Sequence, residues 1–116
     1  MPSILVVEDD FDLRDSLGSL LRDEGCQTVV VPNGHDALAW LREHPAPDLI
    51  LLDLMMPRMN GEQLFAELKK DEALARIPVV VLSAVDDEDQ RKRVPGAAAY
   101  LRKPINIADL LSALRL

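Results

Sequence analysis

Several short apolar runs of this 116-residue chain are each followed by a side chain that could do chemistry. Glu8-Asp9-Asp10 follow the first run, and Asp53 follows the third. Ser83 and Lys103 follow the fourth and the fifth. Carboxylates, a hydroxyl and an amine are suited to phosphoryl chemistry, because an Asp carboxylate can act as a nucleophile toward phosphorus. We therefore ask whether the fold brings these groups together.

The carboxylates predict a cation site. Carboxylates that lie close together repel one another and raise one another's pKa unless a cation lies between them. Carboxylate oxygens on loops suit Mg²⁺, which binds few protein carboxylates and keeps several waters. Lys103 could offset further charge, and Ser83 could donate one hydrogen bond to an oxygen. With the cation, these groups would offset the charge on a transferring phosphoryl group.

Five apolar runs predict the strands that position these groups. Each run is apolar at successive positions and does not alternate, as expected for strands buried on both faces of a parallel sheet. The carboxyl ends of parallel strands meet at one edge of an open α/β sheet, so the side chains that follow the runs would meet there. The predicted strands are Ile4–Val7, Thr28–Val31, Leu49–Leu52, Val79–Leu82 and a weaker Ala99–Leu101.

Stretches with helical spacing separate the runs and predict helices on both faces of the sheet. In the first stretch, Phe11, Leu17, Leu20 and Leu21 share one face, and Arg14 is available for solvent. The predicted fold class is therefore α/β, with a five-stranded parallel sheet. Apolar positions at 37–41, 64–68 and 107–114 predict further helices, and an acidic start with a basic end at 86–93 predicts a short fourth helix.

The composition narrows the class of protein. The chain has 20 acidic and 13 basic side chains and a net charge of −7, which argues against a sequence-independent grip on nucleic acid. Cys26 is the single cysteine, so the chain has no internal disulfide and no Cys-based zinc site. We see no signal peptide and no run near the roughly 18 apolar residues of a membrane span. We expect one cytoplasmic domain over residues 1–116, without nucleic-acid or membrane partners.

Four segments in order resemble the receiver domain of two-component response regulators, the CheY-like family. The resemblance spans nearly the whole chain, from Ser3 to Leu114, and each segment lies at a predicted strand end. It implies a flavodoxin-like sheet order of 2-1-3-4-5. The segments are Ile4 to Asp10 (first strand and acidic cluster), Pro47 to Gly61 (phosphoacceptor), Val79 to Ala84 (switch hydroxyl) and Tyr100 to Pro104 (final motif).

The resemblance implies a role for each matching acid. Asp53 would accept a phosphoryl group from a phosphohistidine on a sensor histidine kinase or a phosphotransfer protein. Mg²⁺, or Mn²⁺ in its place, would be bound by Asp9 directly and by Glu8 mostly through a bound water. Asp53 and the backbone carbonyl of Met55 would complete the protein ligands.

The resemblance also implies a switch. Ser83 would hydrogen-bond one phosphoryl oxygen and move inward, and Lys103 would pair with another. The peptide bond from Lys103 to Pro104 would be cis, an arrangement almost confined to X–Pro. Tyr100 would swing from exposed to buried as Ser83 moves, which biases the face built from the fourth helix, fifth strand and fifth helix. That face would signal to an effector domain or a downstream protein.

Two other functions stay open beside the switch. A degenerate receiver that only binds protein would not need the complete acidic, hydroxyl and lysine positions. A phosphohydrolase resembling the haloacid-dehalogenase class would need a second acid where this chain has Met55. We expect no turnover enzyme, only self-phosphoryl transfer and autodephosphorylation. The stretch between Ser83 and Lys103 is shorter than expected for the family, which leaves the oligomeric state open.

Two positions near the predicted site indicate a long-lived phosphoryl group. The residues two beyond Asp53 and Ser83 are Met55 and Val85, and neither side chain can orient a water for attack on an acyl phosphate. We expect the phosphorylated protein to persist well beyond seconds. Loss of phosphate over time after removal of the phosphodonor measures this, and a lifetime of seconds would contradict it.

Overall fold

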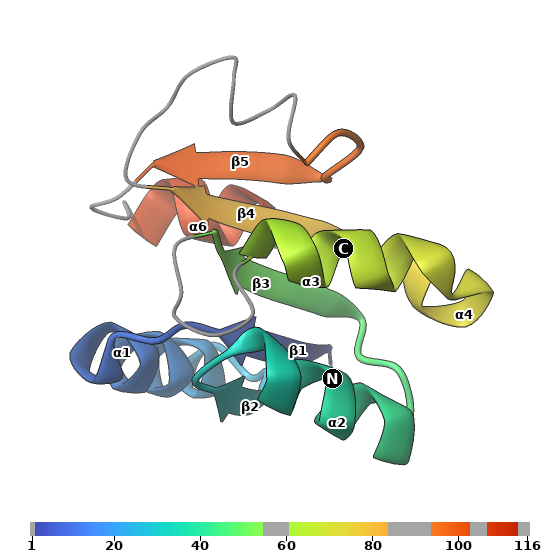
Figure 1. Ribbon diagram of the computed structural model, residues 1–116. Helices are drawn as coiled ribbons and strands as arrows, with labels where there is room; N and C mark the ends of the chain where they lie inside the picture. The colour runs from blue at the N-terminus through green and yellow to red at the C-terminus, as the bar shows by residue number, and fades with distance from the viewer. Residues whose placement is uncertain (1, 55–60, 84–93, 103–106, 114–116) are drawn as a thin grey trace.

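The computed structural model describes residues 2–54, 61–83, 94–102 and 107–113, and it forms one parallel sheet of five strands in the order β2-β1-β3-β4-β5 (Figure 1). The predicted sheet order and all five predicted strands are confirmed. Each strand is one residue longer than its apolar run, because the pairing continues onto a polar neighbour. The strands are β1 (Ser3–Val7), β2 (Gln27–Val31), β3 (Leu49–Asp53), β4 (Val79–Ser83) and β5 (Ala99–Arg102).

The central strands are buried on both faces. Four consecutive residues of β1 and all five of β3 are buried, with Leu5 and Ile50 fully inaccessible to solvent. The edge strand β2 is less covered, and only Val31 at its end is buried. Continuous apolar runs thus mark strands that bury both faces, as expected for a parallel sheet.

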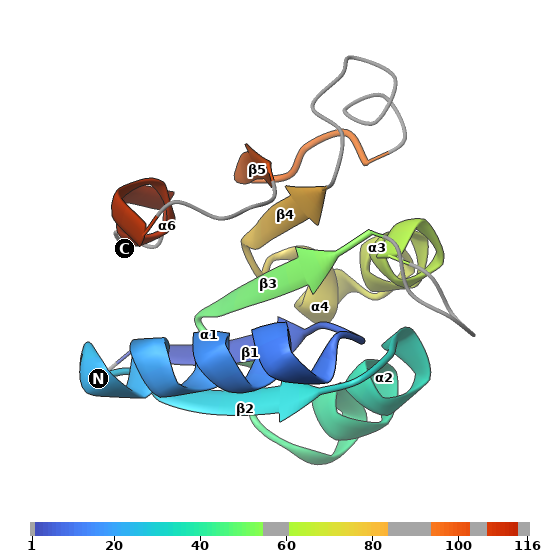
Figure 2. The same cartoon turned by 90° about the vertical axis from the view of Figure 1, so that its left-hand side faces the viewer.

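Helices cover both faces of the sheet, as predicted (Figure 2). One face packs under α1 and α6, with Leu17, Leu21 and Leu110 in its core. The other face packs under α2 and α3, with Leu38 and Leu64 among its buried side chains. The helices are α1 (Phe11–Asp23), α2 (Gly34–Glu43), α3 (Gly61–Lys70), α4 (Glu72–Ala75) and α6 (Ile107–Ala113).

The short helix α4 was not predicted from the sequence. Its four residues are too few to show a helical period, but Asp71 caps it by accepting hydrogen bonds from the Ala73 and Leu74 amides. Leu74 is buried against the same core as α3. The predicted helix at 86–93 lies outside the described residues. Among the residues that the structure describes, no helix is long and apolar enough to cross a membrane.

The first turn of α1 corrects one expectation. We predicted Phe11 on the buried face and Arg14 toward solvent, but Phe11 is 68% exposed and Arg14 is half-buried. The buried residues of α1 begin only at Leu17. Phe11 is the first residue of the helix and lies beyond the end of β1, where the sheet no longer covers it. Helical spacing shows which face of a helix is apolar, but it does not show which turns of that face pack against the sheet.

Candidate functional site

Pairing of β1 with β3 brings three predicted acids together. Val7 pairs with Leu52, so the residues that follow them leave the sheet side by side at its carboxyl edge. One carboxylate oxygen from each of Glu8, Asp9 and Asp53 lies within 4.8 Å of the others. We call these three residues the acidic cluster. The predicted convergence of these three acids is thus present in the structure.

The acidic cluster is largely shielded from water. Glu8 is 0% and Asp53 is 1% exposed, whereas Asp9 is exposed. Two carboxylates held in a dry environment close to a third lose hydration and repel one another. A divalent cation with oxygen ligands would offset this charge, and the exposed side of Asp9 leaves room for the waters that such a cation keeps. The donor set therefore fits Mg²⁺ or Mn²⁺.

The three consecutive acids Glu8, Asp9 and Asp10 have different roles where the chain enters α1. The Asp10 side chain accepts a hydrogen bond from the Leu13 amide at 3.1 Å and caps the helix. Its own amide donates to Glu8 Oε2 at 3.2 Å. The Glu8 amide donates to the Val31 carbonyl at 3.1 Å, which continues the pairing of β1 with β2. Asp10 thus has a structural role, whereas the two acids before it, Glu8 and Asp9, belong to the acidic cluster with Asp53.

Gly61, the first residue of α3, packs directly against the backbone of Asp53 and Leu54. The Leu54 amide donates to the Leu82 carbonyl at 3.2 Å, and the Gly61 amide donates to the Leu54 carbonyl at 3.0 Å. A Cβ on Gly61 would lie 2.5 Å from the Asp53 carbonyl oxygen and 2.5 Å from the Leu54 Cα. No side chain fits at that separation, so the start of α3 can reach the end of β3 only because residue 61 is glycine.

The other predicted site residues are placed in part. Ser83 ends β4 and pairs with Arg102 of β5, so its backbone lies at the same carboxyl edge as Asp53. Tyr100 of β5 is half-buried, and its hydroxyl donates to the Val94 carbonyl at 2.7 Å. Met55, Lys103 and Pro104, with the predicted cis peptide, lie outside the described residues.

Arg14 is a neighbour of the site that the sequence interpretation missed. Its Nη1 donates to the Glu8 carbonyl at 3.0 Å and lies 3.5 Å from the Asp9 carbonyl. We had assigned it to solvent because it falls on the polar face of the helix. A usable signal was its place one turn inside a helix that follows an acidic strand end, since helical side chains point back toward the N-terminus.

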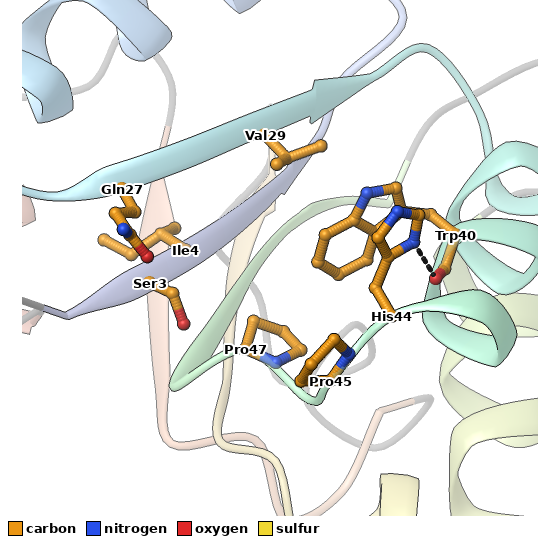
Figure 3. Close-up of a pocket in the computed structure, with 8 residues that line it drawn as sticks. All are labelled: Ser3, Ile4, Gln27, Val29, Trp40, His44, Pro45 and Pro47. Atoms are coloured by element: carbon orange, nitrogen blue, oxygen red, sulfur yellow. Dashed lines mark hydrogen bonds between the residues drawn. The ribbon is translucent and has the colours of Figure 1, made fainter.

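The opposite end of the sheet carries a cavity of about 200 Å³ with a different lining (Figure 3). Trp40 and His44 stack with ring centroids 4.5 Å apart, and His44 Nδ1 lies 2.9 Å from the Trp40 carbonyl oxygen. Among the described residues, no carboxylate lines this cavity, so it is chemically unlike the acidic cluster. Its lining residues are Ser3, Ile4, Gln27, Val29, Trp40, His44, Pro45 and Pro47.

Comparisons with known proteins point to one family. A family model described as the response regulator receiver domain matches residues 4–115. PilG of Pseudomonas aeruginosa is 33% identical over 114 residues, which cover 97% of this chain and 84% of PilG. The sensory transduction protein RegX3 of Mycolicibacterium smegmatis is 38% identical over 117 residues, which cover 99% of this chain and 50% of RegX3. The chain thus spans most of one relative and half of the other.

A solved structure with a bound metal has the same fold. The crystal structure of the Mn²⁺-bound form of the response regulator Rcp1 matches with a TM-score of 0.82 and 32% identity. The match covers 97% of this chain and 88% of that one. This chain is therefore similar to Rcp1 in sequence as well as in fold.

The close approach at Gly61 yields a prediction about the site. Gly61→Ala should displace the backbone at Asp53 and lower the free energy of unfolding by about 1–3 kcal/mol, because the new methyl group overlaps main-chain atoms. Urea unfolding measures the stability, and the amide NMR shifts of Asp53 and Leu54 report the displacement.

Ala66→Gly is the matched control for this change. Ala66 is exposed in the middle of α3, and glycine there should reduce stability by about 0.5–1 kcal/mol through helix propensity alone. It should leave the Asp53 and Leu54 shifts in place. Equal shifts in both variants, or none in Gly61→Ala, would contradict the steric account.

Proposed function

This chain belongs to the response regulator receiver family, and we propose that Asp53 accepts a phosphoryl group from a phosphohistidine of a sensor histidine kinase or a phosphotransfer protein. One observation carries this proposal: Glu8, Asp9 and Asp53 converge within 4.8 Å at the carboxyl edge of the sheet. Sites in open α/β sheets form at that edge. The donor set and its place in the fold support the proposed function.

In the proposed transfer, a carboxylate oxygen of Asp53 attacks the phosphorus of the phosphohistidine. The new P–O bond forms as the P–N bond breaks, and the bonding electron pair leaves with the imidazole nitrogen of the donor. Bound Mg²⁺ or Mn²⁺ would offset charge on the phosphoryl oxygens. Glu8, Asp9 and Asp53 would hold it, together with the predicted backbone carbonyl of Met55.

The remaining roles complete a switch. Lys103 and Ser83 would each contact a phosphoryl oxygen, as the sequence motifs predict. Tyr100 would respond to the movement of Ser83. In the state described, the Tyr100 hydroxyl donates to the Val94 carbonyl, and the proposed movement of Tyr100 would break this bond. We propose that the face beside β5 carries the signal onward.

The proposal describes a signalling module and no turnover enzyme. The phosphoryl group would stay on Asp53, and a change of conformation would carry the signal to the output partner. RegX3 is twice as long as the aligned segment, whereas PilG is mostly covered by it. We propose a cytoplasmic location and an effector domain or downstream protein as the output partner.

Asp53→Asn is the direct test of phosphorylation. Asparagine keeps the shape of the side chain but lacks the nucleophilic carboxylate, so phosphoryl incorporation from acetyl phosphate with Mg²⁺ should be lost, as measured by intact-protein mass spectrometry. Asp48→Asn is the control, since Asp48 lies before β3 and accepts a hydrogen bond from the Ser3 amide at 2.8 Å. Phosphorylation that survives in Asp53→Asn, or disappears in both variants, would overturn the proposal.

The neighbouring acids Asp9 and Asp10 should differ in their effect on cation binding. Asp9→Asn should weaken Mg²⁺ binding by about tenfold or more, because it removes a carboxylate from the cluster. Asp10→Asn keeps the helix cap, since asparagine caps as well as aspartate, and should change the affinity by no more than about threefold. Titration followed by NMR distinguishes the two. Equal losses would show that total charge and not geometry determines the affinity.

A further inference from the structure

We propose that Arg14 is a positioning residue for the cation site, holding the turn that aims Glu8 and Asp9 without contacting the cation itself. The inference deepens the proposed function and rests on it, because the cation site is part of that function. It starts from the hydrogen bond between the Arg14 guanidinium and the Glu8 carbonyl oxygen, at 3.0 Å.

The contacts of Arg14 reach the backbone of the acidic turn. Nη1 donates to the Glu8 carbonyl and makes a second, longer contact of 3.5 Å to the Asp9 carbonyl. These two carbonyls belong to the peptide units directly after the two acids. Fixing both units limits the backbone dihedrals at Asp9 and, with the strand pairing of the Glu8 amide to Val31, those at Glu8. That restraint sets the directions in which both side chains leave the backbone.

Arg14 is itself held from two sides. Its backbone amide donates to the Asp10 carbonyl at 2.8 Å, which places it one turn inside the capped helix. Its guanidinium carbon lies 5.4 Å from the centroid of the Phe11 ring, within the range of a cation–π contact. Phe11 is the one large apolar side chain that is strongly exposed among the described residues, and this contact gives its ring a partner. The ring and the turn carbonyls together limit where the guanidinium can lie.

The Arg14 guanidinium has two opposite effects on cation binding. A guanidinium close to a cation site repels the cation, so its charge alone would weaken binding. A guanidinium that orders the ligands strengthens binding, because less freedom is lost when the cation binds. The two effects have opposite signs for removal of Arg14, and residues that orient metal ligands typically change the affinity by about 10–100-fold. We expect the ordering of the ligands by Arg14 to outweigh the repulsion of the cation.

Arg22 provides a matched control on the same helix. It lies near the other end of α1, and its Nη2 donates to the Thr28 carbonyl at 3.0 Å. Each arginine therefore links the helix to a backbone carbonyl, but only Arg14 does so at the acidic turn. Arg14→Met and Arg22→Met remove the same charge, and each removes a 3.0 Å hydrogen bond from a guanidinium to a backbone carbonyl.

The experiment titrates Mn²⁺ into the wild type, Arg14→Met, Arg22→Met and Arg14→Lys, with free Mn²⁺ followed by electron paramagnetic resonance. Arg14→Met should raise the Kd by about tenfold or more, and Arg22→Met by less than about twofold. Arg14→Lys keeps the charge and can donate to one carbonyl, so it should recover part of the loss. In the metal-free state, hydrogen exchange at the Asp10 amide should be faster in Arg14→Met than in Arg22→Met, because that amide reports order in the turn.

Other outcomes overturn the proposal. Tighter Mn²⁺ binding in Arg14→Met would mean that repulsion by its charge prevails, and equal binding in the two methionine variants would mean that Arg14 does not position the ligands. A wild type that binds no Mn²⁺ would overturn the cation site and this role together. Normal cation binding and a clear Arg14 effect, without phosphorylation of Asp53, would overturn the proposed function and leave the positioning role in place.

Discussion

The parallel pairing of β1 with β3 is the constraint on which the site depends. It aligns Val7 with Leu52 inside a core that excludes water, and it delivers Glu8 and Asp53 to the same point in a buried state. Burial of carboxylates carries an effective penalty of several kcal/mol for each ion. The burial of the apolar central strands contributes free energy against this penalty. The apolar strands therefore hold the charged site in place as well as forming the core.

The residues around the cluster serve this geometry in different ways. Asp10 begins α1, Arg14 holds the turn carbonyls, and Gly61 lets α3 close on the backbone after Asp53. None of these three contributes a carboxylate to the acidic cluster. Each acts on the backbone at a strand end, where a small displacement would move a ligand oxygen. The site is thus built from backbone restraints around a few acids.

The two edges of the sheet differ in chemistry. The carboxyl edge gathers acids, whereas the cavity at the amino edge is lined by Trp40, His44 and two prolines and contains no acid. The arrangement follows the general placement of sites in open α/β sheets. The match to receiver domains over residues 4–115 covers both edges, and the relatives show the same domain as most of one protein and as half of another.

The sequence alone determined the strands, the sheet class and the acids that follow the strands, because short apolar runs and the residues after them are local patterns. The resemblance to the family singled out Glu8, Asp9 and Asp53 among those acids. The residue pattern by itself did not show that Asp10 would cap a helix, because neighbouring acids look alike until the turn is built. It misplaced Phe11 and Arg14 for a related reason. A helical period gives the face of a side chain, but the end of the sheet decides whether anything lies opposite that face. Only the packing of α1 past the end of β1 left Phe11 exposed and turned Arg14 back onto the acidic turn.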